Sequence, residues 1–456
     1  MSKNQLKAIL IGAGDRGMNT YGFYAINNPD DLNFIAVAEP DLNRRISFSE
    51  AHKIPEDYQF SDWAEILDKP KFADIAFIAT QDQMHEEPAI KAMELGYHVL
   101  LEKPIATTEE ACKNIVETSE REGVVLMIAH ELRYAEFFIK IKEILDSGKV
   151  GDIITINHYL NFHFWAYAHG FVRGNWNNRD ETTPMILAKA CHDFDLICWY
   201  AGVKPIKVSS FAREPYLTPK NRPEGAPDRC TDGCPHADTC QYNAISIYLD
   251  VIQPRRELIF SGNKMLSYFV RLSINHQNIL RLLFPPARKH LPYRGWPINV
   301  LTNDLTDEGI MKALKEGPYG RCVYACNNNQ VAVQVNNIEF ENGIVASLTM
   351  HGHSTKNNRR IRIDGTKGSI VGNFSEGEML ITVYDQVEGT YEPIKFKFKV
   401  ELHGGGDVRL LNTLIAAVRG ETQAYTRARE SVQSHLISLA ADRSAREGKI
   451  IEIKQK

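Results

Sequence analysis

The chain has 456 residues, more than one compact domain usually holds, so two domains are expected. Its composition, 43% apolar and 24% charged, is that of an ordinary globular protein. The 53 basic and 57 acidic residues give a net charge of −4. This balance argues against a nucleic-acid partner and against attachment to an anionic membrane, because both need a concentrated positive surface.

The N-terminal apolar stretch, Leu6–Ile11, is too short for a secretory signal or a membrane span, and a glycine turn follows it at once. We interpret it as a strand and expect a cytoplasmic protein. In that reducing compartment the eight cysteines are expected as thiols or metal ligands rather than as disulfides.

Residues 1–130 alternate apolar strands with helical stretches. Strands are predicted at 7–11, 34–38, 73–79, 98–101 and 124–129. Helices between them include 86–95 and 109–121, the second capped by Thr107 or Thr108. Apolar strands separated by helices predict a parallel sheet covered on both faces, which is a doubly wound α/β (Rossmann) domain.

Residues 131–456 predict a second, α+β domain. It begins with a helix at 134–147, a strand at 153–159, a helix at 193–200 and a strand at 206–211. A proline-rich, irregular insertion that could cover a site follows at about 213–320.

Turn residues then join strands predicted at 331–340, 344–351, 359–364, 368–372 and 379–384 as antiparallel hairpins, and helices at 407–419 and 427–448 complete the chain. An open, mainly antiparallel sheet of this kind favours a homo-oligomer, either a dimer or a tetramer.

The clearest motif is a glycine-rich turn that follows the first strand and opens the first helix. It comprises Gly12, Ala13, Gly14, Asp15, Arg16 and Gly17. In a Gly-x-Gly-x-x-Gly pattern the first glycine permits the tight turn, the second lets amides approach a pyrophosphate, and the third lets helix and strand pack closely. We predict that these six residues bind a dinucleotide; the alternative is a glycine turn without a ligand.

Glu39 ends the next predicted strand. A carboxylate there accepts hydrogen bonds from ribose hydroxyls and repels a 2′-phosphate, so NAD is the expected cofactor. A plain surface role for Glu39 stays open, and Arg44 or Arg45 could admit NADP.

A second motif, Glu102-Lys103-Pro104, stands at the carboxyl end of strand 98–101. Ligands of open α/β sheets bind at this end, so Lys103 should point toward the nicotinamide crevice. An ammonium there can hold a substrate hydroxyl and stabilise negative charge developing on its oxygen. The alternative is a solvated loop lysine.

Together the motifs resemble the Gfo/Idh/MocA oxidoreductase family over nearly the whole chain apart from the 213–320 insertion. The matching residues are the glycine turn, Thr80 to His85, Glu102-Lys103-Pro104, Arg133-Tyr134, Gly148-Lys149-Val150-Gly151, His192 with Asp195, and Gly365-Thr366-Lys367-Gly368. The resemblance implies an NAD(P)-dependent dehydrogenase or reductase for hydroxyl or keto groups of sugars, inositols and related polyols. It places Thr80, His85, Glu102 and Lys103 at the cofactor, and implies that Lys103 orients the substrate and that His192 is the general base.

The chain departs from the family beside this histidine. Many relatives carry an aspartate four positions before it, where Ala188 stands here. On a continuous helix Lys189 and His192 would face one site, flanked by Asp193 and Asp195, and two lysines near one crevice would lower each other's pKa. We hypothesise that Lys189 takes the aspartate's role and that Asp195 contacts substrate; the alternative for Lys189 is an exposed helix lysine.

Further substrate-binding candidates are Arg173, Asn175 and Trp176, which combine hydrogen-bond donors with an aromatic plane as a polyol requires. His403 stands beside the glycine run 404–406 and is another candidate; the alternative there is a plain helix entry capped by Asp407.

Five cysteines fall in or near the insertion: Cys230, Cys234, Cys240, Cys322 and Cys326. Their C-x₃-C-x₅-C and C-x₃-C spacings leave free thiols, structural zinc and adventitious disulfides open, and no metal is assigned.

The leading interpretation is reversible oxidation of a secondary alcohol on a sugar or cyclitol, with His192 accepting the hydroxyl proton and Lys103 polarising the oxygen. A second interpretation keeps the fold but cleaves glycosides by transient oxidation and elimination, with NAD recycled. A third is a non-enzymatic NAD-responsive regulator, which would have no use for a lysine and a histidine aimed at one crevice.

Overall fold

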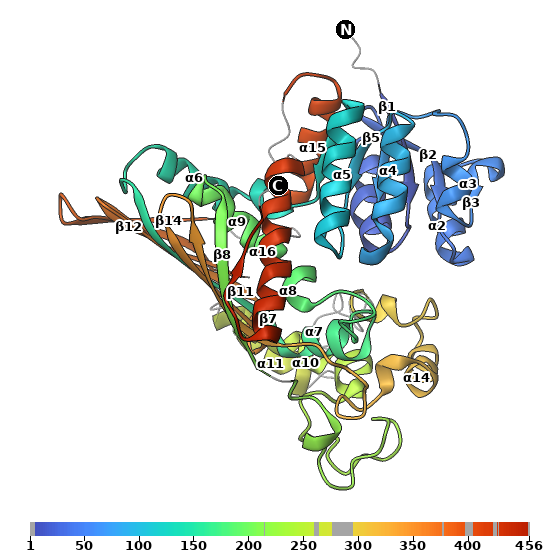
Figure 1. Cartoon of the computed structure of the whole chain (residues 1–456). Helices are drawn as coiled ribbons and strands as arrows, with labels where there is room; N and C mark the ends of the chain where they lie inside the picture. The colour runs from blue at the N-terminus through green and yellow to red at the C-terminus, as the bar shows by residue number, and fades with distance from the viewer. Residues whose placement is uncertain are drawn as a thin grey trace.

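Two sheets organise the chain (Figure 1). The computed structural model describes residues 5–213, 215–259, 264–275, 295–375, 378–396, 405–422, 426 and 428–454. A six-stranded sheet lies in the N-terminal part, and a nine-stranded sheet lies in the rest. The predicted fold class, a Rossmann domain followed by an α+β part with an open, mainly antiparallel sheet, is confirmed.

The first sheet has the order β3-β2-β1-β4-β5-β6, and every pairing in it is parallel. Its strands are β1 (Leu6–Ile11), β2 (Leu32–Ala38), β3 (Gln59–Phe60), β4 (Ile75–Ile78), β5 (His98–Leu101) and β6 (Leu126–Ile128). All four residues of β4 are buried, as expected of a strand covered on both faces. The chain crosses from one side of β1 to the other after β3, so the carboxyl ends of β1 and β4 form the switch point where such sheets bind ligands.

Helices cover both faces of this sheet. They are η1 (Arg16–Gly22), α1 (Phe23–Asn27), α2 (Leu42–His52), α3 (Trp63–Leu67), α4 (Glu86–Glu94) and α5 (Glu109–Glu122). The cap of α5 is Thr108, whose Oγ1 accepts a hydrogen bond from the Ala111 N–H at 3.1 Å. This resolves the predicted choice between Thr107 and Thr108.

The second sheet has the order β14-β13-β12-β11-β7-β10-β9-β8-β15. Its strands are β7 (Ile153–His163), β8 (Pro205–Ala212), β9 (Val333–Phe340), β10 (Val345–Ser354), β11 (Asn358–Gly365), β12 (Gly368–Ser375), β13 (Glu378–Asp385), β14 (Thr390–Lys395) and β15 (Ile451–Glu452). Among the described strands of this sheet, only β7 and β10 pair in parallel. Burial alternates along β9 and β10, so each strand turns one row of side chains to the core and the other outward.

One face of this sheet is covered by helices (Figure 1). They are α6 (Glu136–Asp146), α9 (Cys191–Ala201) and α16 (Ala428–Glu447). The outward rows keep large apolar side chains exposed, among them Tyr159, Val335, Val345 and Tyr384. Such a face is consistent with the homo-oligomer predicted above, which stays a prediction.

Helix α15 (Gly406–Val418) returns to the first sheet although it lies late in the sequence. Leu410, Leu411 and Leu414 share a core with residues of β1, β2 and β4. Figure 1 shows this helix with the helices around the first sheet. The predicted division into residues 1–130 and 131–456 remains a prediction, and the returning helix shows why a single cut along the chain describes the packing incompletely.

The predicted insertion, 213–320, contains more regular structure than expected. Its helices are η6 (Pro219–Asn221), η7 (Ile245–Leu249), α10 (Ile252–Ile259), α11 (Lys264–Asn275), η8 (Ile298–Val300), α14 (Asp307–Glu316) and η9 (Pro318–Gly320). Most of these helices are short. Proline opens η6 and η9, lies inside α10 and directly precedes η8, and it interrupts the periodicity that would have revealed these helices. Across the described ranges no helix combines the length and the apolarity needed to cross a bilayer.

Candidate active site

The glycine turn after β1 is shaped by two close approaches and one open side. Gly12 has φ +96°, and a Cβ there would lie 2.5 Å from the Ala79 carbonyl oxygen at the end of β4. A Cβ on Gly17 would lie 2.2 Å from the Gly12 oxygen, whereas a Cβ on Gly14 would meet nothing within 4 Å. The first and last glycines therefore close the strand–helix turn, and the middle one borders open space, as a pyrophosphate site requires.

Glu39 is held directly over this turn. Its side chain is buried, and its carboxylate accepts hydrogen bonds from the Ala13 N–H at 2.7 Å and the Asp41 N–H at 3.0 Å. Arg45 donates to the Glu39 main-chain oxygen rather than standing free for a 2′-phosphate. These residues fit NAD: Glu39 would hold the ribose hydroxyls, and amides of the turn would hold the pyrophosphate.

Replacing Glu39 with alanine should weaken NADH binding by about 10- to 100-fold, because a charged hydrogen-bond acceptor is lost. NADPH binding should suffer less, since the repulsive carboxylate is gone. Fluorescence titrations with both reduced nucleotides measure the ratio. An unchanged preference between them would show that Glu39 does not select the cofactor.

Lys103 follows β5 and reaches across to the second part of the chain. Its Nζ donates to the Ala188 carbonyl oxygen at 2.8 Å. Glu102, beside it, accepts from Arg16 Nε at 2.5 Å, and its other oxygen accepts the Lys103 N–H at 3.1 Å. Burial alone would raise the pKa of Glu102, but Arg16 and Lys103 hold this pKa below its ordinary value. Glu102 is therefore ionised and stabilises the loop that carries Lys103.

Arg16 and His85, two residues predicted to contact the cofactor, form hydrogen bonds or ion pairs with other residues of the protein. Arg16 pairs with Glu102 and, at 2.9 Å, with Asp407 on α15. His85 is fully buried, with Nδ1 2.7 Å from the Pro104 oxygen and Nε2 3.3 Å from the Thr80 oxygen. This geometry makes both residues supports of the Lys103 loop, and a direct contact with the cofactor stays a prediction. Asp15 is exposed and accepts from Asn19.

His192 lies at the start of α9, next to the end of α8 (Met185–Ala188). The two helices are separate, so Lys189 and His192 flank a break and do not lie on the continuous helix assumed from the sequence. His192 Nδ1 is 3.4 Å from Nδ1 of His130, and His192 Nε2 is 3.4 Å from Glu131 Oε1. The contact of Lys103 with Ala188 brings all three predicted catalytic residues to this break.

Glu131 and His130 were missed by the sequence analysis. Glu131 is buried on η4 (Glu131–Tyr134), directly after β6, and it places a carboxylate at His192 in a chain whose Ala188 replaces the aspartate of relatives. Burial, with Arg133 and Lys103 nearby, lowers the pKa of His130 well below its ordinary value, so this imidazole is neutral. The sequence signal was available: polar residues follow a strand at its carboxyl end.

Lys189 packs its ammonium 4.5 Å from the centre of the Phe162 ring. Burial, then repulsion from Lys103 and Arg359, lowers the pKa of Lys189 to about 7. The direction is the one expected for two neighbouring lysines. The carboxylate next to His192, however, is that of Glu131. Glu131 is therefore an alternative to Lys189 as the residue that takes the role of the missing aspartate.

The acidic residues after His192 are tied to other cations. Asp193 pairs with His158 and Arg359, each at 2.7 Å. Asp195 accepts two hydrogen bonds from Arg133, at 2.6 and 2.7 Å. With both oxygens engaged, Asp195 is better placed to hold α9 than to contact substrate, and the predicted contact is not supported by this geometry.

Replacing Arg133 with methionine should destabilise the protein by about 3–5 kcal/mol, because it leaves Asp195 buried without its charge partner. Urea denaturation followed by circular dichroism measures the loss. The double variant Arg133→Met, Asp195→Leu should recover most of it, since no buried charge is left behind. A single variant as stable as the parent would contradict the assignment.

The other residues predicted to contact the substrate lie in different environments. Arg173 donates to the main-chain oxygens of Arg321 and Tyr242, both at 2.7 Å, so it fastens the insertion to the second part of the chain. Trp176 donates its indole N–H to Asp82, after β4, at 2.9 Å, and so links the two parts. Asn175 is exposed, and His403 lies outside the described residues. Substrate contacts of these residues stay predictions.

All eight cysteines are free thiols. Cys230, Cys234, Cys240 and Cys322 line one small cavity together with Arg173. Among the residues that the structure describes, no group of histidine, cysteine and acidic side chains is arranged to hold a metal ion.

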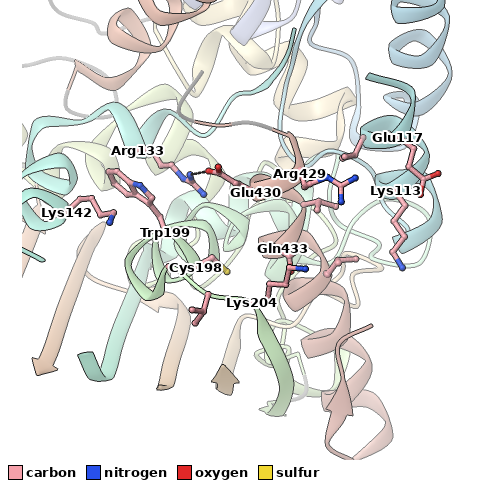
Figure 2. Close-up of a pocket in the computed structure, with 15 residues that line it drawn as sticks. Lys113, Glu117, Arg133, Lys142, Cys198, Trp199, Lys204, Arg429, Glu430 and Gln433 are labelled. Carbon is pink, nitrogen blue, oxygen red and sulfur yellow. Dashed lines mark hydrogen bonds and ion pairs between the residues drawn. The ribbon is translucent and has the colours of Figure 1, made fainter. Parts of the chain in front are cut away.

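A separate surface groove is lined by residues of α5, α9 and α16 (Figure 2). Figure 2 shows Arg133 directed at Glu430, and the two side chains approach to 3.4 Å. Trp199, Lys204 and Arg429 also line the groove. None of the predicted cofactor or catalytic residues lines it, so the chemistry is located by the convergent polar groups above and not by this hollow.

A dinucleotide turn at the switch point, with an acidic residue after β2 and a lysine and a histidine nearby, defines an NAD-binding oxidoreductase. The family model described as "Oxidoreductase family, NAD-binding Rossmann fold" matches residues 6–130. Two further models, "GFO/IDH/MocA C-terminal domain" and "Oxidoreductase family, C-terminal alpha/beta domain", match residues 138–231 and 317–453. The chain belongs to the Gfo/Idh/MocA oxidoreductase family, and the predicted family, enzyme class and NAD cofactor are confirmed.

Several known proteins resemble the chain at low sequence identity. The protein YteT of Bacillus subtilis (strain 168) is 23% identical over 351 residues, 75% of this chain and 72% of YteT. The WlbA dehydrogenase of Bordetella pertussis, solved with NADH and UDP-GlcNAcA, is 16% identical with a TM-score of 0.61, covering 99% of each chain. The myo-inositol 2-dehydrogenase of Lactobacillus plantarum is 15% identical with a TM-score of 0.62, covering 99% of this chain and 100% of its own. At 16% and 15% identity, the two solved structures show that the fold is shared and nothing more.

Proposed function

We propose that this oxidoreductase transfers a hydride between NAD and a secondary hydroxyl or keto group of a sugar, inositol or related polyol. The proposal rests chiefly on one observation: Lys103, from the end of β5, contacts Ala188 at the end of α8, close to His192 at the start of α9. Two proteins of similar fold agree with a substrate rich in hydroxyl groups: one was solved in complex with NADH and UDP-GlcNAcA, and the other is a myo-inositol 2-dehydrogenase.

Each residue has a distinct task in this proposal. The Lys103 ammonium donates a hydrogen bond to the reacting oxygen and stabilises the negative charge that develops on it. His192 accepts the hydroxyl proton, and the Glu131 carboxylate favours the imidazolium that forms. Bound NAD supplies the hydride acceptor at the carbon. Both contacts of His192 are long, at 3.4 Å, as is common before substrate tightens such a site.

A substrate panel tests the proposal. Sugars, inositols and aryl glycosides are each offered with NAD, while NADH absorbance and products are recorded. Net NADH formation with a polyol supports the proposal. Aryl glycoside cleavage without net NADH would favour the alternative of transient oxidation and elimination, in which the cofactor is recycled. Neither reaction with any compound would contradict both.

The same proposal includes a cytoplasmic homo-oligomer, a dimer or a tetramer, that acts on small molecules and not on nucleic acid. The exposed apolar row on the second sheet supports the homo-oligomer. The net charge of −4 argues against nucleic acid as a partner. Light scattering of the purified protein measures the oligomeric state.

A further inference from the structure

Two lysine ammonium groups lie at the candidate active site, and neither has a carboxylate in direct contact. Lys103 Nζ is bonded to the carbonyl oxygen of Ala188, the residue directly before Lys189, and Lys189 Nζ lies over the Phe162 ring. Within the described part of the chain neither ammonium forms an ion pair. A carbonyl dipole and an aromatic face compensate a partly buried cation only in part.

The carboxylates around the two lysines are all engaged elsewhere. Glu102 and Asp407 pair with Arg16, Asp193 with Arg359 and His158, Asp195 with Arg133, and Glu131 lies at His192. The ammonium groups of Lys103 and Lys189 thus lie at the candidate active site, while the nearby carboxylates contact other residues. Lys103 and Lys189 are therefore left without a carboxylate in direct contact.

The titration of Lys189 agrees with its lack of a direct carboxylate partner. Burial, Lys103 and Arg359 together lower the pKa of Lys189 to about 7, although Glu131 and Asp193 act in the opposite direction. An anion bound against Lys189 would restore its charge. A neutral ligand would leave it as it is.

We propose that the substrate carries a carboxylate in addition to the hydroxyl group that reacts, and that Lys189 binds this carboxylate while Lys103 holds the reacting oxygen. The substrate class is then the acidic sugars, such as uronic and aldonic acids, and not neutral sugars or inositols. This inference rests on the proposed function and narrows it.

Calorimetric titration of the NADH-loaded protein tests the inference with matched pairs: D-glucuronate against D-glucose, D-galacturonate against D-galactose, and D-gluconate against D-sorbitol. At least one acid should bind about 10- to 100-fold more tightly than its neutral partner, the worth of a charged hydrogen bond. Lys189→Met should abolish this difference, whereas Lys189→Arg should keep most of it. Lys113→Gln, a lysine on α5 that lines the groove of Figure 2, is the matched control and should change nothing.

The pH dependence gives a second readout. Above a pH of about 7 a growing share of Lys189 is neutral in the free protein, so carboxylate binding must take up a proton. The affinity for the acid should then fall by up to about tenfold per pH unit, and titrations in buffers of different ionisation enthalpy should report the uptake. Both effects should vanish in Lys189→Arg, whose side chain stays charged.

Failure of the inference and failure of the proposed function give different results. If acids bind no better than their neutral partners, or if Lys189→Met binds them as well as the parent does, the inference is wrong. Reduction of NAD by neutral polyols alone would leave the function standing and overturn the inference. Lys189-dependent binding of acids without NADH formation from any compound would support the inference and contradict the function.

Discussion

Lys103→Met should lower kcat by about 10²- to 10³-fold, the usual effect of removing one preorganised donor from a developing oxyanion. The ammonium is half-buried and held by the Ala188 carbonyl, so its position is set before substrate arrives. Because methionine is unbranched, nearly as long as lysine and uncharged, packing of the loop should survive. Steady-state kinetics with the best polyol from the panel give the value.

The affinity for NADH provides the control for Lys103. It should stay nearly unchanged in Lys103→Met, since the pyrophosphate and the adenosine ribose are expected to be held by the glycine turn and Glu39, and Lys103 is expected to lie only beside the nicotinamide. Lys113→Met, the same change on α5, should keep full activity. A Lys103→Met protein with near-parental kcat would remove Lys103 from the chemistry.

His192→Ala should lower kcat by about 10²- to 10⁴-fold, the range that a positioned general base contributes. Glu131→Gln should lower kcat by a smaller factor, because the glutamine keeps the shape of the side chain but no longer stabilises the imidazolium. Rates measured with each variant at saturating NAD and substrate test both expectations.

A histidine away from the site is the comparison for this pair. His236 lies in the insertion, where Nε2 contacts the Glu224 oxygen, and His236→Asn should leave kcat as it is. If Glu131→Gln behaves like the parent while His192→Ala is inactive, the imidazole acts without its carboxylate. If His192→Ala keeps near-full activity, the base has been misassigned and Lys189 becomes the alternative.

The fold followed from local patterns wherever these were strong. Continuous apolar strands and capped helices identified the first sheet, and β5 was predicted to the residue at 98–101. The second sheet was recognised by its turns, but β14 was missed because its residues are mostly exposed and lack an apolar alternation. The return of α15 to the first sheet could not be predicted, since it depends on contacts between residues some 400 positions apart.

The site was predictable in part for the same reason. Gly12, Glu39 and Lys103 stand at strand ends, so topology alone gathers them. Glu131 reaches His192 only because η4 packs against α9, a contact that no spacing encodes. Arg173, attractive as a donor, instead holds the insertion through two carbonyl oxygens, and sequence cannot distinguish a donor aimed at a ligand from one aimed at the backbone.

A crystal structure of the protein with NAD bound is the most direct measurement. We expect the dinucleotide across the carboxyl ends of β1 and β4, with Glu39 on the adenosine ribose and the nicotinamide beside Lys103 and His192. A dinucleotide bound anywhere else, or a nicotinamide turned away from both side chains, would contradict this expectation.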